Sequence, residues 1–489
     1  MTHWQAYPWR WVVLTTFFLS AAASAGVWIS LAPIAHEAAI YYGTTTAAIN
    51  WFSLAFMIVY TFSSFGALHF GDNLGIRKIL IIGATCTTIC VLLRAISTIS
   101  SIHHTGTGYA LALLGQFIGA IGQPIFANAP AAVAGAWFPR AERELGTTIA
   151  AMSTPLGNGI FSVLASVIVS EPSQVASWQI IEAVIVVVCT ILLILTQRDG
   201  PPTPPSTAAA ARAALRAAHT AQQRTHVPLL DDPVDMVTGL DEEDLSDEEV
   251  VQVIDRERAD SIAMAGGGML AEALHMLKDR NFLLLTLGYG IGLGFFNTYI
   301  TITGQLILPC GYGSNIAGIC AGVLLGCGIL GAALTGPVMR AWGNYGAMLR
   351  IGIVMGNIGV VCALSANMPD RTGWLIASYG IMGFCIVPIL PLVFEVASET
   401  TYPAPEQVCV TLMQCSGQVF GIIMTLVFPL MITTDCSTVV RPTNIAVLGS
   451  LIVALVSFFA FRIQYKRRAA EHAHDQTLAL APAGDKLAV

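Results

Sequence analysis

Charged side chains are scarce in this chain. Only 11% of its 489 residues are Asp, Glu, Lys or Arg, while 55% are hydrophobic; soluble domains carry roughly 25% charge. The mean hydropathy of +0.69 excludes an ordinary soluble protein and predicts an integral membrane protein in a lipid bilayer. Basic residues are also few, 23 against 30 acidic ones, so we expect no nucleic-acid partner.

The 11 cysteines include no CxxC pair and no Cys/His metal spacing, so we expect no metal and no cofactor. Most lie in apolar runs, where a thiol acts as a small hydrophobe. Cys310 and Cys436 lie in loops; a disulfide between them requires Cα atoms within ~7 Å, and the sequence leaves its formation open. No A-x-A-like cleavage site follows the first apolar run, which we therefore expect to be retained.

Long apolar runs dominate the chain. A helix needs ~20 such residues to cross a bilayer, and twelve runs of this kind divide six plus six. The sequence predicts an all-α polytopic protein with spans at 11–35, 47–69, 79–100, 108–132, 145–170, 175–197, 282–306, 315–339, 349–367, 373–397, 408–433 and 443–462.

Between the sixth and seventh runs lies a polar stretch, 198–280, with 16 of the 30 acidic residues, a composition typical of disorder. With a cytoplasmic N-terminus, 20 of the 23 basic residues lie inside, which predicts that both termini are cytoplasmic. We expect the host to be the plasma membrane and the protein to be a monomer. The expected organisation is a cytoplasmic N-terminus (1–10), a six-helix bundle (11–197), a mostly disordered cytoplasmic linker (198–280), a second six-helix bundle (281–462) and a cytoplasmic tail (463–489).

The two halves repeat each other. A shift of 264 positions places Gly119 on Gly383, Pro124 on Pro388, Pro139 on Pro403 and Glu142 on Glu406. Parallel six-helix repeats are the architecture of major facilitator transporters, and the turn from Asp72 to Arg77 resembles that superfamily's D-x-x-G-x-R/K loop. The resemblance implies two pseudo-symmetric bundles that work by alternating access.

Polar groups near mid-span are the candidates for cargo binding, because lipid penalises them and a central cavity does not. They are Trp28, Gln123, Asn297, Tyr299, Gln414 and Gln418. No Asp, Glu, Lys, Arg or His occupies the middle of spans one, four, seven, ten or eleven, which favours facilitated diffusion over ion symport. Arg94 and Glu182 lie elsewhere in spans; we interpret them as outer-leaflet polar contacts or as side chains snorkelling toward the interface.

A closer resemblance joins several motifs across nearly all twelve spans. These are Arg10-Trp11-Val12-Val13-Leu14 leading to Trp28, Tyr42-Gly43 to Trp51, Leu114-Gly115-Gln116 to Gln123, Trp137-Phe138, Glu399-Thr400-Thr401-Tyr402-Pro403 and Ser416-Gly417-Gln418-Val419-Phe420-Gly421. Together they resemble the feline leukaemia virus subgroup C receptor family, whose members are described as transporters of haem or of choline and ethanolamine. The resemblance implies a small-molecule cargo of one of these kinds.

By position in those motifs, Trp28, Gln123 and Gln418 match family residues that line the choline site. A tryptophan face attracts a quaternary ammonium by a cation–π interaction worth ~2 kcal/mol or more when desolvated. Asn297 stands where the family places a second cage aromatic, so either Phe296 or Tyr299 replaces that ring or the cargo differs.

Charged residues in the turns between spans form a candidate inner gate, which solvated loop charge explains equally well. The set is Asp72, Arg77, Arg140, Glu142, Arg143, Glu399 and Glu406. The leading hypothesis is a uniport-like carrier of a small organic cation such as choline or ethanolamine. Haem or another porphyrin is the alternative cargo, and a non-transporting receptor is the alternative class. No nucleophile–base pair appears in the spans, so we do not expect an enzyme.

Overall fold

A computed structural model describes residues 7–203, 273–342, 344–401, 406–433 and 436–466. All regular secondary structure in these ranges is helical. Twelve helical segments are long and apolar enough to cross a membrane, which confirms the predicted all-α polytopic fold. Linker residues 204–272 and most of the predicted tail lie outside the described ranges, so their disorder stays a prediction.

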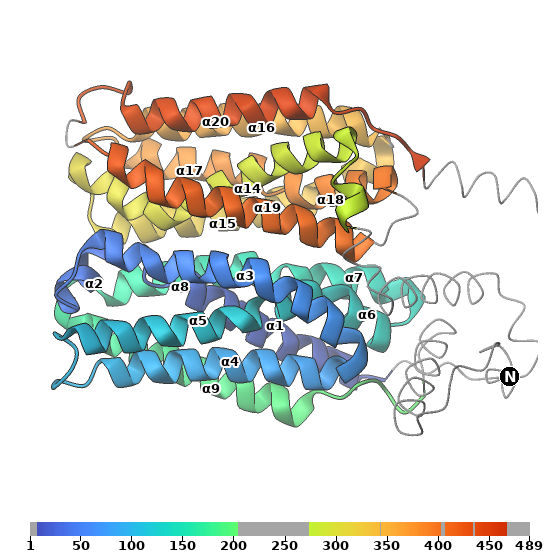
Figure 1. The fold of residues 1–489 in the computed structure, drawn as a ribbon, viewed down its shortest axis with the longest axis horizontal. Coiled ribbons are helices and arrows are strands. Elements are labelled where there is room, and N and C mark those ends of the chain that lie inside the picture. The colour runs from blue at the N-terminus through green and yellow to red at the C-terminus, as the bar shows by residue number, and fades with distance from the viewer. Residues whose placement is uncertain (1–6, 204–272, 343, 402–405, 434–435, 467–489) are drawn as a thin grey trace, which may run out of the picture.

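The helices form two bundles that lie side by side (Figure 1). The N-terminal bundle contains α1 (Trp9–Ile29), α2 (Ala35–Tyr41), α3 (Thr46–Leu74), α4 (Ile76–Ser97), α5 (Gly106–Asn128), α6 (Pro130–Trp137), α7 (Arg140–Ala151), α8 (Ser153–Ile168) and α9 (Val175–Thr196). The C-terminal bundle contains α14 (Arg280–Ile307), α15 (Ser314–Trp342), α16 (Tyr345–Ala366), α17 (Thr372–Ile386), α18 (Ile389–Thr401), α19 (Glu406–Val427) and α20 (Pro442–Ala460).

Several predicted spans depart from single continuous helices: the fourth crosses the break between α5 and α6 at Ala129, and the fifth divides into α7 and α8 at Met152. The first was expected to run to residue 35, but α1 ends at Ile29 and a turn through Pro33 leads into the short helix α2. The tenth divides into α17 and α18 around Pro388, because proline lacks the N–H that continues a helix. Pro124, which the repeat aligns with Pro388, lies inside α5, so the bundles are similar without being identical.

Small residues let helices of one bundle approach closely, as is common in membranes. A Cβ placed on Gly122 of α5 would lie 2.5 Å from the carbonyl oxygen of Gly83 in α4, and one on Gly115 would lie 2.8 Å from that of Cys90. The backbones of α4 and α5 are therefore in direct contact.

The ends of α1 and α20 define two opposite faces of the molecule. We call the side on which α1 begins and α20 ends the termini face, and the other side the opposite face. On the opposite face, Cys310 and Cys436 form a disulfide with a Cα–Cα distance of 5.4 Å, which resolves the alternative that the sequence left open. It joins the end of α14 to the loop before α20.

Candidate functional site

The two bundles meet at the opposite face. Gln305 at the end of α14 donates a hydrogen bond from Nε2 to Oδ1 of Asn50 in α3 at 2.7 Å. A Cβ on Gly304 would lie 3.2 Å from the carbonyl oxygen of Pro33, in the turn between α1 and α2. A polar contact and a close backbone approach therefore close this face.

Helices α8 and α15 pack closely near the opposite face. A Cβ on Gly318, near the start of α15, would overlap the side chain of Ser166, and one on Gly322 would overlap Val163. Gly326 lies one turn further along, and a Cβ there meets no atom within 4 Å. Helices α8 and α15 thus pack closely near the opposite face, and the bundles also meet near mid-span, where Sγ of Cys415 in α19 donates to the carbonyl oxygen of Thr61 in α3 at 3.6 Å.

Three candidate residues of the C-terminal bundle lie together. Asn297 of α14 donates from Nδ2 to Oε1 of Gln418 in α19 at 3.4 Å. One turn earlier in α19, Oε1 of Gln414 accepts a hydrogen bond from the hydroxyl of Tyr289 at 3.1 Å. Asn297 is 5% exposed and both glutamines are half-buried. These contacts form a neutral polar surface along α14 and α19.

The candidates in the N-terminal bundle are an aromatic ring and an amide. Trp28 lies in the last turn of α1 with 7% of its surface exposed. Its indole N–H is buried and has no hydrogen-bond partner within the described residues, although a buried tryptophan usually finds one. Gln123 lies in α5 directly before Pro124 and is half-buried.

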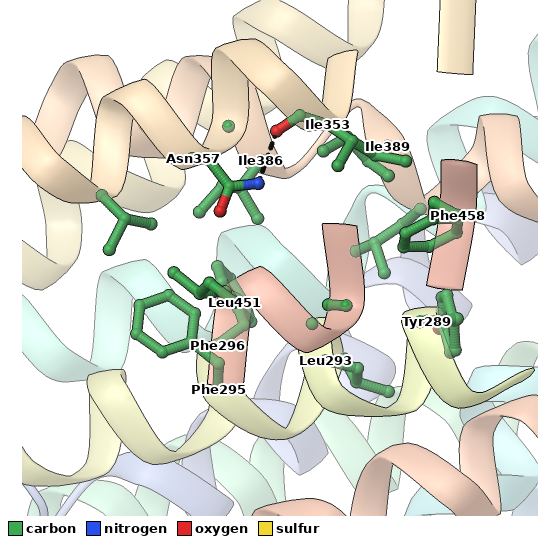
Figure 2. Close-up of a pocket in the computed structure, with 16 residues that line it drawn as sticks. Tyr289, Leu293, Phe295, Phe296, Ile353, Asn357, Ile386, Ile389, Leu451 and Phe458 are labelled. Atoms are coloured by element: carbon green, nitrogen blue, oxygen red, sulfur yellow. Dashed lines mark hydrogen bonds between the residues drawn. The ribbon is translucent and has the colours of Figure 1, made fainter. Parts of the chain in front are cut away.

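Tyr299 lies apart from this set. It is 2% exposed, its ring centre is 5.5 Å from that of Tyr379, and its hydroxyl accepts a hydrogen bond from Asn367 at 3.5 Å. These partners belong to the C-terminal bundle, so the packing favours a structural role. Phe296 points into a separate apolar cavity that it shares with Asn357 of α16 (Figure 2).

Arg94 and Glu182 form an ion pair inside the N-terminal bundle. Nη2 of Arg94 lies 2.9 Å from Oε2 of Glu182, and both side chains are 0% exposed. The expectation of a polar contact was therefore correct, and that of snorkelling was wrong. The sequence signal was the presence of one charge of each sign in spans three and six.

The predicted gate residues whose contacts are described pair within one bundle. Glu142 lies 3.0 Å from Nη2 of Arg10, at the start of α1. The backbone N–H of Arg77 donates to Oδ1 of Asp199 at 3.0 Å. Glu399 is buried in α18 and Arg143 is half-buried in α7. The side chains of Asp72, Arg140 and Glu406 lie outside the described set, so the gate stays a prediction.

Comparisons with known proteins give one family and one fold. The model of the Major Facilitator Superfamily matches residues 13–433. Solute carrier family 49 member A3 of Danio rerio is 23% identical over 417 residues, which cover 84% of this chain and 76% of that protein. The choline/ethanolamine transporter FLVCR2 of Homo sapiens is 24% identical over 425 residues, which cover 85% and 71%.

Solved structures share the fold at low identity. The inward-open xylose transporter XylE from E. coli superimposes with a TM-score of 0.64 at 11% identity, covering 92% of this chain and 96% of that one. A bacterial homologue of the human lysosomal transporter Spinster, inward-facing and unoccupied, gives 0.61 at 14% identity, covering 93% and 97%. With its twelve spans, its two bundles and a family match over nearly the whole membrane region, the chain belongs to the major facilitator superfamily.

Proposed function

We propose that this transporter is a facilitative carrier of a small organic cation such as choline or ethanolamine, working by alternating access in the plasma membrane with both termini in the cytoplasm. Two similar bundles that meet at the opposite face through Gln305 and Asn50 support alternating access. The similarity to choline/ethanolamine transporters supports the cargo class.

The ion pair between Glu182 and Arg94 supports the proposal of uniport. An ion-coupled carrier needs a titratable group that can exchange protons or ions during the cycle. Glu182 lies 2.9 Å from Nη2 of Arg94 in a fully buried pair, and removing one partner of such a pair is strongly unfavourable. It therefore acts as a fixed counter-ion, and the candidate cargo residues themselves are neutral.

The cargo chemistry follows from those neutral residues. A quaternary ammonium needs an electron-rich ring and no hydrogen-bond acceptor, which Trp28 offers at the end of α1. The hydroxyl of choline can bond to an amide such as Gln123, Gln414 or Gln418. Asn297 adds a further amide beside Gln418.

Equilibrium binding of labelled choline to purified protein tests the cargo site. Trp28→Phe keeps part of the cation–π attraction, so it should weaken binding less than Trp28→Ala, which we expect to lose at least tenfold in affinity. Trp342 is exposed at the end of α15, so Trp342→Ala is the matched control and should bind as wild type.

The competing cargo is tested in the same experiment. Haem binding that Trp28→Ala leaves unchanged, with no choline binding by wild type, would contradict the proposed cargo. Equal and small effects of both Trp28 variants on choline binding would assign this ring to packing.

A further inference from the structure

The last turn of α1 is held by side chains from other helices. Arg94 of α4 donates from Nη1 to the carbonyl oxygen of Val27 at 3.3 Å and from Nη2 to Oγ of Ser30 at 3.1 Å. Gln116 of α5 donates to the same carbonyl at 3.4 Å. The last carbonyls of a helix lack partners within it and form its negative end, so a buried cation is well matched there. Trp28 lies between the two anchored residues.

Glu182 of α9 makes that buried cation tolerable. An arginine without a counter-ion in an apolar interior is strongly destabilising. The carboxylate of Glu182 lies 2.9 Å from Arg94, and both side chains are fully buried. The pair thus brings a charge to the end of α1 without leaving net charge inside the bundle.

Helices α4 and α9 also hold the other end of the segment that follows α1. The hydroxyl of Tyr42 lies 2.8 Å from Oγ of Ser97 in α4 and accepts a hydrogen bond from Nε2 of Gln179 in α9 at 2.7 Å. Each of these partners is one helical turn from the ion pair. Residues 30–42 are therefore anchored to α4 and α9 at both ends.

We propose that Arg94 and Glu182 are positioning residues, which fix the last turn of α1 so that Trp28 presents its indole to the cargo in a constant place and orientation. This inference rests on the proposed role of Trp28. A cation–π contact depends on the placement of the ring face, so a loosened turn lowers cargo affinity although neither charged residue touches the cargo.

The double variant Arg94→Gln/Glu182→Gln removes both charges and keeps a hydrogen-bonding side chain at each position. It should weaken choline binding about tenfold and accelerate amide hydrogen exchange in residues 26–42. Thr88→Val is the matched control: it removes the 2.9 Å contact between Thr88 and Thr190 of the same two helices without touching α1. Binding and exchange should stay unchanged in this control.

A double-mutant cycle with Trp28→Ala separates positioning from general stability. If the pair acts through Trp28, the double variant costs no further affinity in the Trp28→Ala background. Equal losses in both backgrounds, or unchanged exchange in residues 26–42, overturn the inference. If the double variant does not fold, Arg94→Lys takes its place, because one ammonium group cannot reproduce the fork that reaches Val27 and Ser30.

A wild-type protein that binds no choline contradicts the proposed cargo alone. The exchange measurement then decides: faster exchange in residues 26–42 of the variant supports positioning of the turn, and unchanged exchange overturns it.

Discussion

Two glycines of α15 should respond in opposite ways to the same substitution. A Cβ on Gly318 would overlap the side chain of Ser166 and lie 2.9 Å from the carbonyl oxygen of Ser162 in α8. A Cβ on Gly326 meets no atom within 4 Å. Gly318→Leu should therefore disfavour the conformation described above, in which α15 packs against α8 at the opposite face, and Gly326→Leu should leave it intact.

The size of the effect follows from the cost of overpacking, about 1–3 kcal/mol, which corresponds to roughly 5- to 150-fold in an equilibrium between two conformations. Gly318→Leu should shift the population by this factor toward the conformation open at the opposite face. In that conformation the termini-face half of α15 approaches α8, so Gly326→Leu should obstruct it and shift the population the other way.

Distances measured by electron paramagnetic resonance test both shifts. Spin labels at Ser101→Cys and Asp370→Cys are suitable, because both residues are exposed in loops of the opposite face, one in each bundle, once the unpaired cysteines are replaced with alanine. Gly318→Leu should lengthen the label distance and Gly326→Leu should not. Identical distributions in both variants and wild type, or lengthening by Gly326→Leu, would refute the reasoning.

Further substitutions test individual contacts. Gly75 has φ of +79°, and a Cβ there would lie 2.8 Å from Oδ1 of Asp199. Gly75→Ala should therefore destabilise the N-terminal bundle by about 1–3 kcal/mol, which thermal unfolding measures. Gly66→Ala is the control and should leave the stability unchanged, because a Cβ on Gly66 meets no atom within 4 Å. Cys436→Ala removes a disulfide between residues 126 positions apart and should lower the free energy of unfolding by about 2–4 kcal/mol. A reductant should have no further effect on this variant. Equal melting temperatures with and without the bond would contradict the prediction. Asn297→Tyr should raise choline affinity about tenfold if the new ring faces the cargo, and calorimetry showing unchanged or weaker binding would place that position outside the cage.

Hydropathy predicted the twelve spans and the two bundles because a bilayer imposes one length and one polarity on every span. The breaks in the helices were harder to predict. Pro388 separates α17 from α18, whereas Pro124 lies inside α5. Proline weakens a helix wherever it occurs, and whether the helix stops there depends on neighbouring helices, which a sequence pattern does not contain.

The candidate site was only partly predictable for the same reason. Asn297 and Tyr299 are two residues apart, so they point to different sides of α14; Asn297 contacts α19, while Tyr299 packs against Tyr379. Their depth in the span does not show which neighbouring helix each side chain faces. The ion pair of Arg94 and Glu182 joins residues far apart in the sequence, and only the packing of α4 against α9 brings them together.

The central claim is that the protein carries a small organic cation across the membrane without ion coupling. Flux of labelled choline into proteoliposomes, measured with proton and sodium gradients present and then collapsed, tests it most directly. We predict saturable choline flux that persists at the same rate after both gradients are collapsed, because no Asp, Glu, Lys, Arg or His occupies the middle of spans one, four, seven, ten or eleven. Absence of choline flux, or flux that stops when either gradient is removed, would contradict the account.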